Sequence, residues 1–67
     1  MNKRIVILGA GESGTGSAVL AQQKGFDVFV SDSGTVKEKY REILVSHNIS
    51  FEEGKQTPEL IMNAAEV

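Results

Sequence analysis

The stretch "VILGAGESGTGSA", residues 6–18, decides the fold because it places an apolar run directly before a cluster of glycines. Four of the chain's seven glycines lie in this stretch, at Gly9, Gly11, Gly14 and Gly16. Glycine inside an element costs more conformational entropy than any other residue, so the cluster indicates backbone geometry that a side chain would obstruct. The spacing Gly9-x-Gly11-x-x-Gly14, between a predicted strand and a predicted helix, is typical of a dinucleotide-type phosphate-binding turn.

Each glycine of this motif has a separate structural task. Gly9 permits a tight turn, Gly11 lets a phosphate approach the backbone, and Gly14 lets the helix pack closely on the strand. The free amides at the helix start, with about half a positive charge from the helix dipole, then attract phosphate. We therefore predict nucleotide binding here; the alternative is a turn that only packs the helix. Gly16 falls outside the motif, and we expect a ligand or another domain to approach it.

A P-loop is the competing interpretation of these glycines, because Gly9 and Gly14 also have the G-x-x-x-x-G spacing. The next position of a P-loop is a phosphate-binding lysine, and here it is Thr15. The turn is therefore not predicted to hydrolyse ATP. A phosphate held here depends on backbone amides and on the hydroxyls of Ser13 and Thr15, while Glu12 opposes an anion unless its side chain points outward.

Strand and helix patterns alternate along the chain. Ile5 to Leu8 are apolar on consecutive positions, which is typical of a strand buried on both faces. Gly25 and Asn48 are natural helix ends because both tolerate the left-handed conformation. The patterns predict strands at 4–8, 26–32 and 49–53, and helices at 13–24, 36–47 and 57–64.

Strands that alternate with helices predict an α/β fold with a parallel sheet and right-handed crossovers. The order is β-α-β-α-β-α, followed by the truncated start of a fourth strand at Ala65–Val67. We expect a Rossmann-like open sheet with the strand order 3-2-1-4, in which the fourth strand is incomplete. An element that stops as it begins indicates that residues 1–67 are the front of a longer protein.

Composition limits the classes of partner. A net charge of −2 argues against non-specific binding to nucleic acid or to anionic membranes. Without cysteine the chain has no disulfide, thiolate nucleophile or zinc–thiolate site, which fits a reducing cytoplasm. No apolar run approaches the ~20 residues of a membrane span. We therefore expect a cytoplasmic protein with no nucleic-acid and no membrane partner.

Asp32 is the other residue that fits a nucleotide site, because an acid at the end of the second strand can accept hydrogen bonds from a ribose or a base. His47 has no cysteine or second histidine beside it and suits a helix end, and Tyr40 suits the boundary of the core. Glu52 and Glu53 are adjacent in a strand and point to opposite faces, so they are poor candidates for joint acid–base chemistry. The sequence therefore predicts no catalytic residue and no metal site in this chain.

Three features together resemble the Mur ligases of peptidoglycan synthesis. The first is the glycine turn written GAGESG, with Ser13 in its centre, and the second is the pair Asp32-Ser33 that closes the second strand. The third is the segment I-x-F-E-E-G at 49–54, followed by a helix and "AEV". The chain resembles the front of the first domain of those Mur ligases that join D-glutamate to UDP-N-acetylmuramoyl-L-alanine.

The resemblance implies a binding site for the UDP end of that substrate. By position, the site comprises Gly11, Glu12, Ser13, Gly14, Thr15, Asp32, Ser33 and Gly34. The loop at 11–15 would contact the diphosphate, with Ser13 as its side-chain donor. Asp32 and Ser33, with the backbone of Gly34, would contact the uridine.

The resemblance also implies a parent enzyme of three domains that uses ATP and magnesium. It would phosphorylate the substrate carboxylate, and the D-glutamate amine would attack the acyl phosphate. The central ATPase and C-terminal domains of such an enzyme, with its metal ligands, lie downstream of this chain. Residues 1–67 are thus expected to be an incomplete N-terminal UDP-binding domain that has no cofactor of its own, partners the remaining domains, and catalyses nothing alone.

Two other classes of protein stay open on the residues alone. Ala18 extends the glycine motif and Asp32 suits a ribose 2′-hydroxyl, as in an NAD-binding module of a dehydrogenase or a transport-regulatory protein. The chain could also be a packing or interaction module with a vestigial turn. In every case Ile5 to Leu8 lack most of a fourth-strand neighbour. We therefore expect either self-association through this edge or through Ala65–Val67, or else a marginal, partly disordered monomer.

Overall fold

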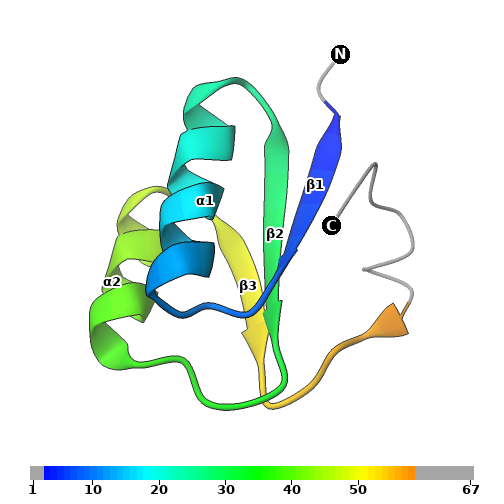
Figure 1. Cartoon of the computed structure of the whole chain (residues 1–67), viewed down its shortest axis with the longest axis vertical. Coiled ribbons are helices and arrows are strands. Elements are labelled where there is room, and N and C mark those ends of the chain that lie inside the picture. Colours follow the sequence, from blue (N-terminus) through cyan, green and yellow to red (C-terminus); the bar gives the residue numbers. More distant parts are fainter. Residues whose placement is uncertain (1–2, 59–67) are drawn as a thin grey trace.

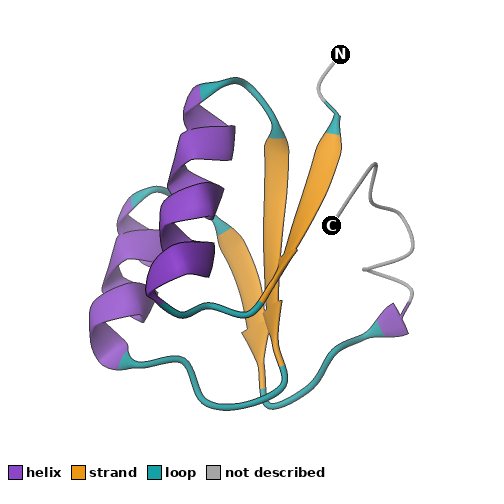
Figure 2. Cartoon of the chain, in the orientation of Figure 1, coloured by secondary structure: helices purple, strands orange, loops and turns teal. Residues whose placement is uncertain are grey.

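The structure is a computed structural model that describes residues 3–58. Three parallel strands and two helices alternate along the chain, as Figures 1 and 2 show. The elements are β1 (Arg4–Leu8), α1 (Glu12–Gln23), β2 (Asp27–Asp32), α2 (Glu38–Ser46) and β3 (Ser50–Glu53). The predicted α/β class with an open parallel sheet is confirmed. The predicted third helix, beyond Pro58, and the strand start at Ala65–Val67 lie outside the described residues.

The sheet has the order β1-β2-β3, with both pairs of neighbours parallel. This is the predicted order 3-2-1, read from the other edge. Ile7 of β1 lies beside Val30 of β2, which lies beside Phe51 of β3. Because the strands run parallel, their carboxyl ends meet at one edge of the sheet, where ligands bind in open α/β folds.

Both helices cover the same face of the sheet (Figure 1). The core lies between this face and the helices, where Val30 and Leu44 are fully buried. Ala18 of α1 is also fully buried, and its small side chain lets the helix lie close to the strands. The position of α1 over the sheet therefore depends on small residues.

The opposite face of the sheet is also buried at its centre. Side chains alternate along a strand, so Val6 and its register partner Phe29 lie on this face. Val6 is fully buried and Phe29 is 8% exposed, with the Arg4 guanidinium 5.3 Å from the centre of its ring. The burial of Ile5 and Val6 confirms the predicted burial on both faces for the first part of the strand, whereas Leu8 at its end is 45% exposed.

The predicted helix ends are confirmed, and one helix start is wrong. Gly25 and Asn48 have φ angles of 93° and 57°, so both take the left-handed conformation after a helix. The helix predicted from Val36 begins only at Glu38. Val36 is buried, as its spacing predicted, but its amide hydrogen-bonds to the distant Glu53 carboxylate and the residue remains in the loop.

Candidate functional site

The glycine turn joins the end of β1 to the start of α1. Gly9 has a φ of 102°, and its amide donates to the Ser31 carbonyl at 2.7 Å, which ties the turn to β2. A Cβ atom on Gly14 would lie 1.9 Å from the Gly9 carbonyl oxygen. Only glycine fits at position 14 without a shift of the helix, in agreement with the packing role predicted for it.

Gly11 has the opposite environment, because a Cβ atom there would meet no atom of the described part of the chain within 4 Å. Gly11 is the N-cap of α1, and no side chain among residues 3–58 caps this helix end by a hydrogen bond. An open groove of about 580 Å³ lies against the turn, lined by Ile7, Leu8, Gly9, Gly11, Glu12, Ser13, Gly14 and Ser17. Uncapped amides at a helix start, next to open space, can bind an anion.

Asp32 ties the two chain segments of the site together. One carboxylate oxygen accepts the Ala10 amide at 2.7 Å, and the other accepts the Gly34 amide at 2.8 Å. The Ala10 amide first, and then the Gly34 amide, hold the pKa of the Asp32 carboxyl below its ordinary 3.8, against an opposing effect of burial. The carboxylate is therefore charged at neutral pH. Its two oxygens offer about four acceptor positions, so it can still receive a ligand hydroxyl.

A second, smaller groove of about 270 Å³ joins the glycine turn to the start of α2. Its lining comprises Ala10, Gly11, Glu12, Asp32, Thr35, Lys37 and Tyr40. The structure thus brings Gly11 and Glu12 together with Asp32, as a nucleotide site requires. Lys37 supplies a positive charge that the sequence analysis did not place at this site.

The remaining predicted site residues are divided between the two grooves and their surroundings. Ser13 is exposed and lines the groove beside the glycine turn. Ser33 and Gly34 are exposed next to Asp32, outside the lining of both grooves. Thr15 is 2% exposed, and its hydroxyl donates to the Ala10 carbonyl at 3.3 Å. Its side chain therefore holds the turn in place.

Sequence reasoning missed three residues that line the smaller groove: Thr35, Lys37 and Tyr40. Tyr40 is half-buried against the core, as predicted, and the Lys39 ammonium lies 5.0 Å from the centre of its ring. The i, i+3 charge pattern of this segment is typical of a solvated helix face. No local pattern places these residues at the groove, because the path of the loop at 33–37 depends on the contacts of Val36 with Glu53 and Arg41.

Glu52 and Glu53 point to opposite faces, as predicted. Glu52 accepts hydrogen bonds from the Ser31 hydroxyl and from the amide and hydroxyl of Thr57. Glu53 instead pairs with Arg41 of α2 at 2.9 Å. Each carboxylate therefore holds different chain segments together: Glu52 binds Ser31 and Thr57, and Glu53 binds Arg41.

Within residues 3–58, no group of three or more His, Cys, Asp or Glu residues is placed to hold a metal ion. No helix in the same range is long and apolar enough to cross a membrane.

Comparison with known proteins identifies close relatives. A family model described as the MurD N-terminal domain matches residues 4–65. A UDP-N-acetylmuramoylalanine–D-glutamate ligase of Bacteroides thetaiotaomicron is 65% identical over 65 residues, which are 97% of this chain and 15% of the relative. Proteins of the same name from Porphyromonas gingivalis and Christiangramia forsetii are 54% and 52% identical, over 94% and 96% of this chain and 14% of each relative. No solved structure matches the chain significantly.

The family match includes both parts of the candidate site, since residues 4–65 contain the glycine turn and Asp32. The chain spans about 15% of the length of the curated relatives that it matches. The resemblance inferred from the glycine turn, from Asp32-Ser33 and from the segment at 49–54 is confirmed. The chain belongs to the MurD N-terminal domain family.

Proposed function

We propose that this chain holds the UDP end of the substrate of a cytoplasmic ligase that joins D-glutamate to UDP-N-acetylmuramoyl-L-alanine. The observation that carries the proposal is the uncapped start of α1 at Gly11, which opens onto the same groove as Asp32. A diphosphate needs the first feature and a nucleoside needs the second. The names of the relatives, which are all ligases of this kind, support this choice of substrate.

In this proposal the residues divide by the part of UDP that they contact. The diphosphate lies against the helix start, where the amides after Gly11 and the exposed Ser13 hydroxyl donate hydrogen bonds. Gly14 and Thr15 support this loop, since Gly14 packs on Gly9 and the Thr15 amide and hydroxyl bond to Gly11 and Ala10. Glu12 is exposed, so its carboxylate can turn away from the phosphates.

The uridine end lies beyond the end of β2. Asp32 accepts from a ribose or base donor, while Ser33 and the Gly34 backbone border the same end. The two oxygens of Asp32 are already oriented by the Ala10 and Gly34 amides, so ligand binding needs no rearrangement of the carboxylate. ATP, magnesium and the acyl-phosphate chemistry belong, in this proposal, to the rest of a three-domain enzyme, and these 67 residues supply no catalytic group.

An NAD-binding module is the second candidate. The fully buried Ala18 on the sheet side of α1 favours it, because this small residue completes the extended glycine motif of NAD-binding folds. Asp32 would then accept the ribose 2′-hydroxyls. Ser13 in the glycine turn and the ligase names of the relatives favour UDP instead.

Calorimetric titration of the full-length protein with UDP and with NADH separates the two candidates. We expect heat of binding with UDP and none with NADH. Saturable binding of NADH, with no binding of UDP, would replace the ligase proposal with the NAD-binding alternative.

A further inference from the structure

The loop at 33–37 forms one wall of the smaller groove. Thr35 and Lys37 of this loop line the groove together with Gly11 and Glu12 of the glycine turn. The loop has no regular secondary structure, so its position depends on side chains that hold it from outside. Val36, between the two lining residues, is 2% exposed and therefore fixes where they can lie.

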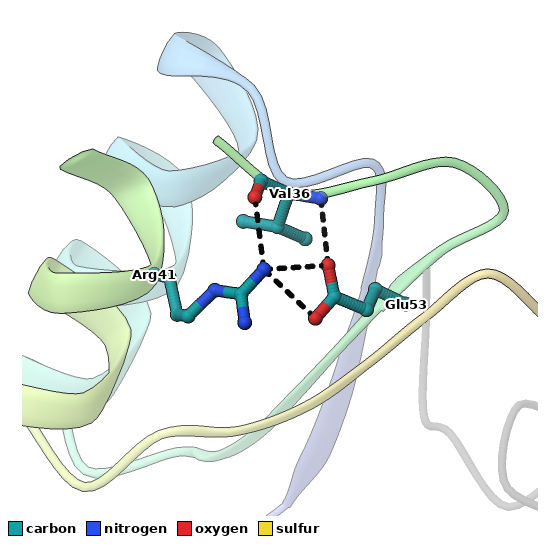
Figure 3. Close-up of polar contacts among 3 residues, drawn as sticks. All are labelled: Val36, Arg41 and Glu53. Atoms are coloured by element: carbon teal, nitrogen blue, oxygen red, sulfur yellow. Dashed lines mark hydrogen bonds and ion pairs between the residues drawn. The ribbon is translucent and has the colours of Figure 1, made fainter. Parts of the chain in front are cut away.

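Glu53 and Arg41 bind both backbone groups of Val36, as Figure 3 shows. The Val36 amide donates to Glu53 Oε1 at 2.9 Å, and Arg41 Nη2 donates to the Val36 carbonyl at 3.2 Å. The same Arg41 nitrogen lies 3.0 Å from Glu53 Oε1 and 2.9 Å from Oε2. One carboxylate from the end of β3 and one guanidinium from α2 therefore clamp the middle of the loop.

Further hydrogen bonds connect the end of β3 to the glycine turn. The Gly54 amide, next to Glu53, donates to the Gly34 carbonyl at 2.8 Å. The Gly34 amide donates to Asp32, and Asp32 accepts the Ala10 amide. A continuous series of hydrogen bonds thus links the end of β3, the loop wall, Asp32 and the glycine turn.

We propose that Glu53 and Arg41 are positioning residues for nucleotide binding, which hold the wall formed by Thr35 and Lys37 at its distance from the glycine turn. This inference rests on the proposed UDP-binding function. Neither Glu53 nor Arg41 lines the groove, so each acts through Val36. The important partner of Glu53 is the Val36 amide, because a partly exposed ion pair contributes little by itself, whereas a backbone amide without an acceptor is costly.

The test is UDP titration of the full-length protein and its variants, with the fold of each checked by circular dichroism. Glu53→Ala removes the acceptor of the part-buried Val36 amide hydrogen bond, and we expect the Kd for UDP to rise about tenfold, as for loss of one such bond. Glu53→Gln keeps an acceptor oxygen and should restore most of the affinity. Arg41→Ala should give an intermediate loss because the Val36–Glu53 bond remains. Glu42→Ala, on the exposed side of α2, is the matched control and should bind UDP like the unaltered protein.

Each outcome has a distinct meaning. If the unaltered protein does not bind UDP, the proposed function and this inference both fail. If it binds UDP, and Gly11→Val abolishes binding while Glu53→Ala leaves the Kd unchanged, only the positioning role is overturned. Equal losses in Glu53→Ala and Glu53→Gln would also overturn it, since the effect would then follow the charge and not the acceptor. A lower melting temperature of Glu53→Ala with an unchanged Kd would leave the pair a purely structural role.

Discussion

At the scale of single residues, Asp32 combines two tasks that the sequence could not separate. Its place at the end of β2 predicted a ligand acceptor, and in the structure its oxygens also accept hydrogen bonds from the amides of Ala10 and Gly34. The two tasks are compatible, because an oriented carboxylate loses less entropy when a ligand donor arrives. An acid at this position is therefore useful to the fold as well as to a nucleotide.

Gly14 and Gly16 lie on the same helix but should respond in opposite ways to the same substitution. Gly14→Ala places a Cβ 1.9 Å from the Gly9 carbonyl oxygen, so α1 must shift, and we expect a loss of about 2 kcal/mol or more in the free energy of unfolding. The Cβ of Gly16→Ala would meet no atom of residues 3–58 within 4 Å, so alanine's helix preference should add about 0.5–1 kcal/mol to the free energy of unfolding. Urea unfolding of both variants measures the difference. Equal effects of the two substitutions would contradict the close contact at Gly14.

At the scale of elements, the sequence predicted the bounds of an element best where no long-range contact competed with the local signals. The bounds of β1 agree with the sequence because an apolar run ends at a glycine turn, and both signals act within a few residues. The predicted start of α2 was wrong. Val36 has helical spacing with Tyr40, but its amide donates to Glu53 of β3, which keeps Val36 in the loop. Contacts between residues so far apart in the chain override local periodicity.

The same reasoning explains which residues of the candidate site could be predicted from the sequence. Gly11 and Asp32 could be placed together from sequence, since Gly11 lies in the turn after β1, Asp32 ends β2, and the carboxyl ends of parallel strands share an edge. Lys37 and Tyr40 could not, because their approach to the groove depends on the path of the loop at 33–37. That path is set by the contacts of Glu53 and Arg41, which no local pattern indicates.

The link between β3 and the segment after it predicts how stability depends on pH. The Thr57 amide is the largest influence that lowers the pKa of the Glu52 carboxyl below its ordinary 4.5; burial opposes it, and the Thr57 and Ser31 hydroxyls and the Lys55 charge assist it. The pKa of Asp32 is also lowered. A carboxyl with a lowered pKa stabilises the fold fully above its unfolded pKa, and this contribution is lost as the pH falls through the folded value.

We therefore expect the free energy of unfolding to be nearly constant above about pH 5 and to fall below about pH 4.5. Glu52→Gln should be less stable than the unaltered chain at neutral pH, and it should lose less stability on acidification. Urea unfolding at a series of pH values from about 7 to 3 measures both effects, with the exposed Glu42→Gln as the matched loss of one carboxylate. An acid-induced loss of the same size in Glu52→Gln and in the unaltered chain would show that the contacts of Glu52 do not carry it.

At the scale of the whole molecule, one edge of β1 has no strand neighbour among the described residues. Among residues 3–58, β1 pairs only with β2, although Ile5 and Val6 are buried like residues of a central strand. The order 3-2-1-4 of doubly wound sheets would put a fourth strand at this edge. An unpaired edge of apolar residues offers amides and carbonyls to a second chain.

We expect the isolated chain to self-associate through β1, or else to remain a monomer of low stability. Sedimentation equilibrium over a range of concentrations, combined with amide exchange of Val6 and Ile7, distinguishes these states. Leu8→Lys places a charge at the end of the edge strand, where Leu8 is 45% exposed, and should weaken association, since charged side chains protect natural edges. Leu20→Lys, at a 55% exposed position on α1, is the matched control and should associate like the unaltered chain. A monomer at every concentration, with strongly protected Val6 and Ile7 amides, would mean that other parts of the chain already cover the edge.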